Sequence, residues 1–446
     1  MFIYVKNFNC TLWGARLGWV DGIGDAVEFE GHVRLSCLDG RPVEASPWRF
    51  LCPGGGLLDV EVEPARPPSW GLWASRRPGV WRYRELLPAP RGVEPVTLGE
   101  GGTPLVPLER VSGEVGARVY GKLEGSNPTG SFKDRGMTVA VTLARSAGAR
   151  VVLVASTGNT AASAAAYAAR AGLEAVVLVP RGAVARGKLA QALLHGAVLV
   201  EVEGSFDDAL AAVIEAVESG SGLYPLNSFN PWRLEGQKTA AFEVAEALGG
   251  RAPDWVVVPV GNAGNIYAIW KGFKELRRHG LIDSLPRMAG VQAAGAAPLA
   301  RAWELGLEEP VPVERPETVA SAIRIGRPVN APKALRAVRE SGGVMTMVSD
   351  EEILRAQADL ARLEGIAVEP ASAAALAGLR RLAREGVVER GETVVLILTG
   401  HGLKDPDAAA LHPARRLTVT ADKAVDAILS IAGSAGLRGA RSFQRR

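Results

Sequence analysis

A lysine in an unusual position, Lys133, is the residue of this sequence that most clearly suggests chemistry. It follows the turn-forming residues 127–131 (NPTGS), in which Ser131 is a good N-cap for a helix. Lys133 is therefore predicted to lie in the first turn of a helix. The positive field of a helix N-terminus disfavours a cation and lowers the pKa of an amine, as a nucleophilic lysine requires. Taken alone, however, a lysine beside Asp134 is more often a solvated surface residue.

Three polar loops follow predicted strands and could bind an anion or a carboxylate near this lysine. Residues 156–163 (STGNTAAS) and 261–265 (GNAGN) each open a helix, and residues 399–405 (TGHGLKD) follow a third strand. Backbone N–H groups at a helix N-terminus favour phosphates and carboxylates, and glycine lets these groups converge. A glycine-rich loop alone is equally compatible with an ordinary tight turn. The position of all three after strands adds weight, because open α/β sheets bind ligands at the carboxyl ends of their strands.

Alternating strands and helices are predicted to position these loops. From Arg118 onward, short β-branched runs alternate with Ala-rich stretches, which indicates an α/β fold with parallel sheets covered on both faces. The predicted strands are 151–155, 175–179, 197–202, 255–260 and 393–398. The predicted helices are 132–147, 159–171, 185–195, 206–219, 232–249, 263–279, 350–364 and 370–386. The Pro-rich residues 310–332 are predicted to form a loop.

Composition limits the classes of protein that fit. The 446 residues are 47% hydrophobic and 22% charged, with a formal net charge of +3 and a pI of about 8.8. These values indicate a globular protein and give no reason to expect a nucleic-acid partner. Neither a secretory signal nor a membrane-spanning run is recognisable, so a cytoplasmic protein with no membrane partner is expected. Three cysteines, Cys10, Cys37 and Cys52, are too few for a disulfide framework.

Taken together and in this order, the motifs over residues 95–410 resemble the fold-type II pyridoxal-phosphate (PLP) enzymes, and among them the threonine synthase family. SFKDRG is similar to the segment whose lysine, here Lys133, holds PLP as a Schiff base and is the natural catalytic base. The resemblance implies that Asn159 contacts the 3-hydroxyl of PLP and that Thr399 contacts the ring nitrogen. The cofactor phosphate would lie on one loop, formed by Gly261, Asn262, Ala263, Gly264 and Asn265.

The resemblance also implies a substrate, O-phospho-L-homoserine, which this family converts with water to L-threonine and phosphate. Residues 227–233 (NSFNPWR) resemble the family segment that binds the substrate phosphate, and the alternative for its arginine is a helix-surface position. His401 is expected near the cofactor as a loop residue and not as a base. The candidate phosphate ligands are Asn227, Ser228 and Arg233, and the candidate carboxylate ligands are Ser156, Thr157 and Thr160.

The family fold implies two parallel-sheet α/β domains with PLP in the cleft between them. The large domain would comprise residues 76–134 and 244–416, and the small mobile domain residues 135–243. A β-rich region over residues 1–75 would precede them, and a tail over residues 417–446 would follow. Homodimers are usual in this family.

The N-terminal region departs from the family pattern. Related chains often begin with a zinc-knuckle-like fold, but here each half keeps a single cysteine, Cys37 or Cys52, and His32 cannot complete four zinc ligands. We therefore expect a degenerate knuckle without a metal. A Cys37–Cys52 disulfide is one hypothesis, because these cysteines lie in two paired turns. Intracellular disulfides are known chiefly from hyperthermophiles.

Other functions fit the same scaffold. Another fold-type II enzyme, such as a threonine dehydratase or a cysteate synthase acting on phosphoserine, would share the fold and most motifs. Residues 227–233 and the TGHGLKD segment favour the threonine synthase reaction over these two. A non-catalytic protein that binds PLP or an amino acid is a third hypothesis. Such a protein would tolerate loss of Lys133 or of residues 261–265, and the sequence retains both.

Overall fold

The computed structural model describes residues 27–182, 186–219, 222–412 and 416–431. Cys10 and the Arg-rich end of the chain lie outside the described residues. The chain divides into two units, Met1–Ala408 and Ala409–Arg446. The second unit, taken by itself, contains a short 3-10 turn, Ala421–Lys423, that continues into a helix over 424–431. No helix in the described parts of the chain is both long and apolar enough to cross a bilayer.

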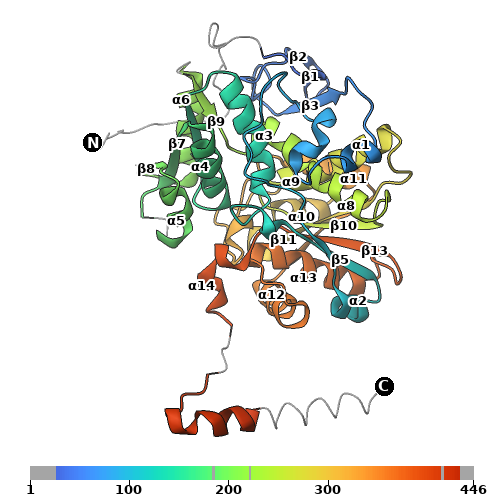
Figure 1. Cartoon of the computed structure of the whole chain (residues 1–446), viewed down its shortest axis with the longest axis vertical. Coiled ribbons are helices and arrows are strands. Elements are labelled where there is room, and N and C mark those ends of the chain that lie inside the picture. The colour runs from blue at the N-terminus through green and yellow to red at the C-terminus, as the bar shows by residue number, and fades with distance from the viewer. Residues whose placement is uncertain (1–26, 183–185, 220–221, 413–415, 432–446) are drawn as a thin grey trace. The chain divides into compact units, whose positions relative to one another are not determined.

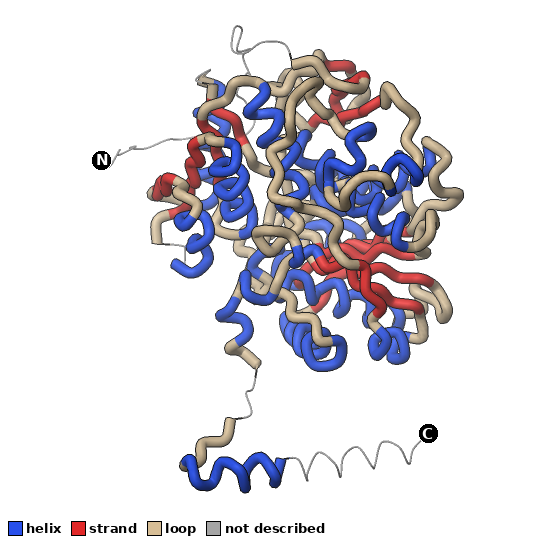
Figure 2. The backbone as a smooth tube through the Cα atoms, viewed as in Figure 1, coloured by secondary structure: helices blue, strands red, loops and turns tan. Residues whose placement is uncertain are grey.

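A six-stranded sheet forms the larger lobe of the first unit, and Figures 1 and 2 show its strands stacked side by side. Five strands run parallel, and the edge strand β4 runs antiparallel to β5, so the sheet is mixed at one edge. In sheet order the strands are β12 (Val344–Val348), β11 (Arg287–Ala293), β10 (Trp255–Pro259), β13 (Thr393–Leu398), β5 (Arg118–Leu123) and β4 (Leu105–Pro107).

Helices cover both faces of this sheet, as its apolar strands require. Alternate residues of β10 belong to different cores: Val256 and Val258 pack with α8, α9 and α11, whereas Trp255 and Val257 pack with α12 and α13. The bounds of these helices are α8 Thr239–Ala247, α9 Gly264–Arg278, α11 Ala331–Glu340, α12 Asp350–Glu364 and α13 Pro370–Arg384. The peripheral helices of the lobe are α2 Glu109–Val115, α10 Pro298–Glu304 and α14 Pro406–Ala409.

A separate four-stranded parallel sheet forms the smaller lobe, drawn in green in Figure 1. Its strands, in sheet order, are β8 (Val198–Val202), β7 (Glu174–Pro180), β6 (Val151–Ala155) and β9 (Leu223–Pro225). Its helices are α3 (Lys133–Ser146), α4 (Asn159–Ala171), α5 (Arg186–Leu194) and α6 (Phe206–Glu218). The prediction of two parallel-sheet lobes is confirmed, with β4 as an antiparallel addition. The exact domain boundaries stay a prediction.

The N-terminal region forms a small antiparallel sheet of three strands, β1 (His32–Cys37), β2 (Pro42–Val43) and β3 (Leu58–Glu63). A disulfide joins Cys37 to Cys52, whose Cα atoms lie 5.4 Å apart, and this confirms the disulfide hypothesis. A short helix, α1 (Trp70–Ala74), and a 3-10 segment, Val80–Leu86, lead into the two larger lobes.

The sequence prediction missed or misjudged several elements. The helix expected over 232–249 is two helices, α7 (Trp232–Gln237) and α8, which meet at Lys238. The strands β5, β11 and β12 were not predicted. Glycine and lysine interrupt the apolar run of β5, glycine and glutamine that of β11, and threonine that of β12. The loop predicted over 310–332 is confirmed except for a 3-10 turn, Ser321–Ile323, and the first residues of α11.

Candidate active site

A pocket lies at the carboxyl ends of β10 and β13 and draws its walls from both lobes. It is lined by residues of the segments that the sequence analysis singled out and by several others. The predicted site residues that line it are Lys133, Asn159, Ser228, Arg233, Gly261, Asn262, Ala263, Gly264, Asn265 and Thr399. Segments that are far apart in the sequence therefore meet in one site.

Four predicted substrate ligands do not line this pocket. Ser156, Thr157 and Thr160 lie in the loop and first turn that open α4 and are partly exposed. The Asn227 side chain is occupied elsewhere: its Oδ1 accepts from the Ala155 N–H and its Nδ2 donates to the Ala155 carbonyl, each at 3.0 Å. Asn227 thus ties the end of β6 to the segment after β9. Substrate roles for these four residues stay predictions.

The helix that carries Lys133 begins differently from the prediction. Phe132, not Ser131, occupies the N-cap position of α3, so the predicted serine cap is wrong. The reason is that the chain before α3 is bound to the loop after β13: the Phe132 N–H donates to the Thr399 carbonyl at 3.0 Å, and Ser131 forms a β-bridge with Gly400. Lys133 is therefore the first residue of α3, and the Thr399 loop holds it in place.

The surroundings of Lys133 favour its neutral amine. Burial, reinforced by the positive charge of Arg233, lowers the pKa of Lys133 to about 7, and Glu369 partly opposes this shift. The direction is the one expected from the sequence, but the largest cause is burial and not the helix N-terminus. A substantial fraction of Lys133 is therefore unprotonated at neutral pH, as a nucleophile or base must be.

Arg233, at the start of α7, is a buried cation without a charged partner among the described residues. The residue is 3% exposed, and burial lowers the pKa of its guanidinium to about 10. Nη1 donates to the Leu226 carbonyl at 2.9 Å, while Nε has no hydrogen-bond partner in the part of the chain that the structure describes. No carboxylate in the described part of the chain forms an ion pair with it. A buried, uncompensated guanidinium that lines a pocket is suited to binding an anion.

The loop from Gly261 to Asn265, called here the cofactor cup, has the geometry of an anion site. Ala263 adopts a left-handed conformation (φ 66°), and it is the one described non-glycine residue with positive φ. It is the N-cap of α9, whose first N–H groups have no partner within the helix. The Asn265 Nδ2 is buried and unpaired. At Gly261 a Cβ would lie 3.0 Å from the backbone of residues 322 and 323, so only glycine fits without displacement.

Glu369, which was not among the predicted site residues, also lines the pocket. The residue is 4% exposed, and its carboxylate accepts hydrogen bonds from the Asn159 Nδ2 at 3.0 and 3.2 Å. Burial raises its pKa, although the bond from Asn159 opposes this. A glutamate directly before Pro370 at the start of a helix was a usable signal, because that position faces the same sheet edge as Thr399. The Thr399 hydroxyl itself lies 2.9 Å from the Ser372 hydroxyl.

Asn330 is a second pocket residue that the sequence analysis missed. It is 1% exposed, its Nδ2 donates to the Ser228 carbonyl at 2.9 Å, and its N–H donates to the Asn262 carbonyl at 3.1 Å. It therefore joins the cofactor cup to the segment that was predicted to bind the substrate phosphate. Nothing in its Pro-rich surroundings distinguished it in the sequence.

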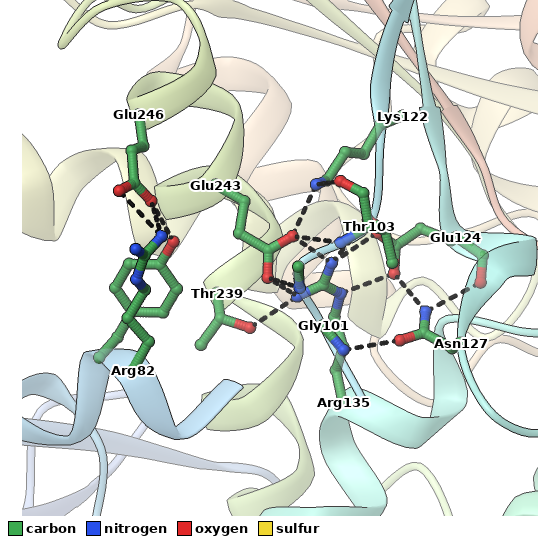
Figure 3. Close-up of polar contacts among 12 residues, drawn as sticks. Arg82, Gly101, Thr103, Lys122, Glu124, Asn127, Arg135, Thr239, Glu243 and Glu246 are labelled. Carbon is green, nitrogen blue, oxygen red and sulfur yellow. Dashed lines mark hydrogen bonds and ion pairs between the residues drawn. The ribbon is translucent and has the colours of Figure 1, made fainter. Parts of the chain in front are cut away.

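A buried ionic network surrounds Arg135, which lies two residues after Lys133 in α3, and Figure 3 shows its members. Arg135 lies between two carboxylates: its Nε is 2.6 Å from Glu124 and its Nη1 is 2.7 Å from Glu243. Lys122 adds a second cation, with Nζ 2.6 Å from Glu243. Burial works against the ionised form of Glu243, but Arg135 and Lys122 outweigh it and hold its pKa below the usual range. The network connects the first turn of α3 to β5 and α8.

Comparison with known proteins agrees with this geometry. Residues 96–400 match the family model described as "Pyridoxal-phosphate dependent enzyme". The chain is 54% identical over 364 residues to a threonine synthase of Methanocaldococcus jannaschii, which covers 81% of this chain and 90% of that protein. It is 58% identical to a threonine synthase of Methanosarcina acetivorans, over 74% of this chain and 81% of that protein. The chain belongs to the threonine synthase family. It is accordingly a PLP-dependent lyase of fold type II.

Solved structures support the fold of this threonine synthase family member. A threonine deaminase from the organism abbreviated "T.th." has a TM-score of 0.56 and 26% identity, covering 71% of this chain and 94% of that one. An L-serine ammonia-lyase from Rhizomucor miehei has a TM-score of 0.60 at 21% identity, covering 72% of this chain and all of that one, and it supports the fold alone.

The pocket residues fit PLP, the cofactor of this family. The cofactor cup offers an unpaired Asn265 amide and the N-terminus of α9 for a phosphate. Lys133 presents an amine of lowered pKa, and Asn159 and Thr399 present polar groups to the same space. These are donors and acceptors of the kinds that an aldehyde, a phenolic hydroxyl, a ring nitrogen and a phosphate each require.

Proposed function

We propose that this protein converts O-phospho-L-homoserine and water to L-threonine and phosphate. One observation carries the proposal: Lys133 and Arg233 line the same buried pocket, one with a pKa near 7 and the other with an unpaired Nε. The first group suits proton transfer at carbon and the second suits binding of an anionic leaving group. The names of the relatives agree with this pairing.

Four parts of the pocket would hold PLP in this proposal. The Lys133 amine would hold the aldehyde carbon, Asn159 the ring hydroxyl, Thr399 the ring nitrogen, and the cofactor cup the phosphate. When bound, PLP supplies an electron sink for the bond broken at the substrate α-carbon. The side chain of Thr399 is a neutral hydroxyl that is hydrogen-bonded to Ser372. It cannot keep the ring nitrogen protonated as a carboxylate would.

The chain's own residues would then bind the substrate and move its protons. The neutral Lys133 amine would take the α-proton and return protons to the neighbouring carbons. Arg233 and Ser228 would hold the substrate phosphate and stabilise it as it leaves as a dianion. Asn227 would also contribute if its amide were released from Ala155. The hydroxyl groups of Ser156, Thr157 and Thr160 would receive the substrate carboxylate at the start of α4.

A single product assay tests the proposal against the alternative functions. The PLP-loaded protein is incubated in parallel with phosphohomoserine, with phosphoserine plus sulfite, and with threonine. We expect phosphate and threonine in equal amounts from the first mixture. Cysteate from the second mixture or ketobutyrate from the third, without phosphate release from the first, would replace the proposal with a cysteate synthase or a threonine dehydratase. A Lys133→Ala variant is the control for uncatalysed hydrolysis.

We further propose that the protein acts as a homodimer in the cytoplasm. Family resemblance supports the dimer, and the sequence features described above support the location. Size-exclusion chromatography with light scattering of the PLP-loaded protein should give twice the chain mass of 46.9 kDa. A single-chain mass at micromolar concentration would overturn the dimer.

A further inference from the structure

The segment that carries Arg233 is fixed at both ends by aromatic side chains. Residues 226–233, called here the anion loop, run from the end of β9 to the start of α7. Tyr224 precedes the loop and Trp232 lies at its far end, and both are fully buried. Each packs against the N-terminal module, defined as residues 29–63, which contains β1, β2, β3 and the disulfide.

The near end of the loop is held by two aromatic residues of the module. Phe50 meets Tyr224 edge to face, with ring centroids 4.9 Å apart and an interplanar angle of 87°. Trp48 meets the same ring at 5.5 Å and 63°. Both residues lie between the bonded cysteines Cys37 and Cys52, so the disulfide closes the segment that presents them.

The far end of the loop is held through Trp232. Its indole Nε1 donates to the Pro47 carbonyl at 3.1 Å, and its ring stacks on Phe29 with centroids 6.0 Å apart. Trp232 is the residue directly before Arg233 in α7. The direction in which the guanidinium enters the pocket therefore depends on a contact with the module.

The module is in turn fixed to the large lobe. Asp59 in β3 accepts from the Tyr267 hydroxyl at 2.6 Å and pairs with Arg336 at 2.6 Å and with Lys333 at 3.0 Å. Tyr267 lies in α9, which begins at the cofactor cup. The module thus contacts the helix of the cofactor cup on one side and both ends of the anion loop on the other.

We propose that the N-terminal module is a positioning element for the substrate phosphate: it sets where Arg233 and the anion loop stand relative to the cofactor cup, with Trp232 as the principal positioning residue. The inference rests on the proposed function, because it takes Arg233 as the ligand of the substrate phosphate. Its specific consequence is that loosening the Trp232 and Phe50 contacts weakens binding of the phosphorylated substrate more than it weakens binding of PLP. These contacts hold the anion loop, whereas Lys133 is held by the loop after β13 and the module contacts α9 at Tyr267, beyond the cup.

Trp232→Phe tests the inference, and Trp70→Phe is its matched control. Both substitutions keep an aromatic ring and remove one indole-to-carbonyl bond of 3.1 Å, since Trp70 Nε1 donates to the Leu281 carbonyl far from the anion loop. In Trp232→Phe we expect KM for phosphohomoserine and the inhibition constant of inorganic phosphate to rise together, by about fivefold or more. The dissociation constant of PLP should change by less than about twofold in both variants.

A second variant, Phe50→Leu, keeps the inference testable if Trp232→Phe does not fold. It removes the edge-to-face contact with Tyr224 without touching α7, and it should raise the same two constants. The inference is overturned if both variants lose thermal stability as Trp70→Phe does while KM and phosphate inhibition stay at wild-type values. If wild-type protein does not turn over phosphohomoserine, the proposed function fails. Calorimetric binding of inorganic phosphate to the PLP-loaded variants then decides the positioning claim separately.

Discussion

At the scale of single residues, the site depends on the pairing of Lys133 with Arg233. The positive charge of Arg233 helps to keep Lys133 neutral, and the Arg233 guanidinium keeps an unpaired Nε for an anion. Glu369 moderates the pair because it favours the charged form of Lys133. The sequence could indicate each residue from its motif, but not that the two meet.

Replacing Arg233 with Gln should raise the pKa of Lys133 above its value of about 7. The sign follows because a neighbouring positive charge disfavours the ammonium form, so its removal makes protonation easier. The pH midpoint for acetylation of Lys133 by acetic anhydride in the apoprotein, followed by mass spectrometry, should therefore shift to higher pH. Arg355→Gln, on the exposed face of α12, is the control and should leave the midpoint unchanged. An unshifted midpoint in Arg233→Gln would contradict the electrostatic coupling.

The ionic network around Arg135 gives a second prediction at this scale. Arg135→Met leaves Glu124 and Glu243 buried with half of their compensation, so we expect the free energy of unfolding in urea to fall by about 3–5 kcal/mol. Arg355→Gln is the control: it removes an exposed ion pair with Glu351 and should change the free energy of unfolding by less than about 1 kcal/mol. The pKa of Glu243 is lower in the folded protein than in the unfolded chain. Its contribution to stability is therefore complete above the ordinary pKa of a glutamate and is lost as the pH falls from there through the lowered native pKa. Equal losses of unfolding free energy in Arg135→Met and Arg355→Gln would contradict the prediction that the buried network stabilises the fold more than an exposed ion pair does.

At the scale of elements, the contact between α3 and α7 brings the lysine and the arginine together. Two glycines allow this contact: a Cβ on Gly236 would lie 1.7 Å from the Arg135 carbonyl oxygen, and one on Gly136 would lie 2.7 Å from the Arg233 carbonyl oxygen. The backbones of the two helices therefore touch directly. Their separation is set by the absence of side chains at these positions.

Gly236→Ala should push the two helices apart and reduce both stability and activity. We expect a loss of about 1–3 kcal/mol in the free energy of unfolding, with a fall in kcat/KM, because the backbone of α3 has no room to yield without moving Lys133. Gly113→Ala in α2 is the matched control: its Cβ meets nothing within 4 Å, and we expect a gain of up to about 1 kcal/mol. Wild-type kcat/KM in Gly236→Ala would contradict the claim that this contact sets the site.

Much of the element pattern was predictable, and the failures have physical reasons. The strands over 151–155 and 393–398 match β6 and β13 because their residues are apolar, apart from Thr393, and mostly β-branched. The strand β5 was missed because Lys122 lies in it, and a lysine normally indicates a surface position. Its buried partner, Glu243, is 121 residues away in the sequence. Asn330 was missed as a site residue for the same reason, because its role depends on contacts between distant segments. Glu369 was missed although its position directly before Pro370 was a usable signal.

At the scale of the whole molecule, one pocket draws on two lobes and depends on a third element. Asn159 comes from the small lobe and Glu369 from the large one, and their side chains are hydrogen-bonded across the site. Apolar residues of the N-terminal module share a hydrophobic cluster with the small lobe, while Asp59 attaches the module to helices of the large lobe. The module therefore packs as an integral part of the same unit as the two lobes.

Reducing the Cys37–Cys52 disulfide should destabilise the protein. The bonded cysteines are 15 residues apart, and closing a loop of that length stabilises a fold by about 3 kcal/mol through the entropy of the unfolded chain. Thermal unfolding with and without reductant, with thiols counted by mass spectrometry, should show a lower midpoint once two thiols appear. A Cys37→Ala, Cys52→Ala double variant should be insensitive to reductant. Two free thiols in the untreated protein would show that the bond is not formed.

The central claim is that the pocket cleaves a carbon–oxygen bond of a phosphorylated amino acid and adds water to carbon. Turnover of phosphohomoserine by the PLP-loaded protein in ¹⁸O-labelled water tests it most directly. Because phosphate leaves with its bridging oxygen, the account predicts label in the hydroxyl group of threonine and none in the newly released phosphate. Label in the phosphate, with homoserine as the other product, would mean simple phosphate-ester hydrolysis and would contradict the account.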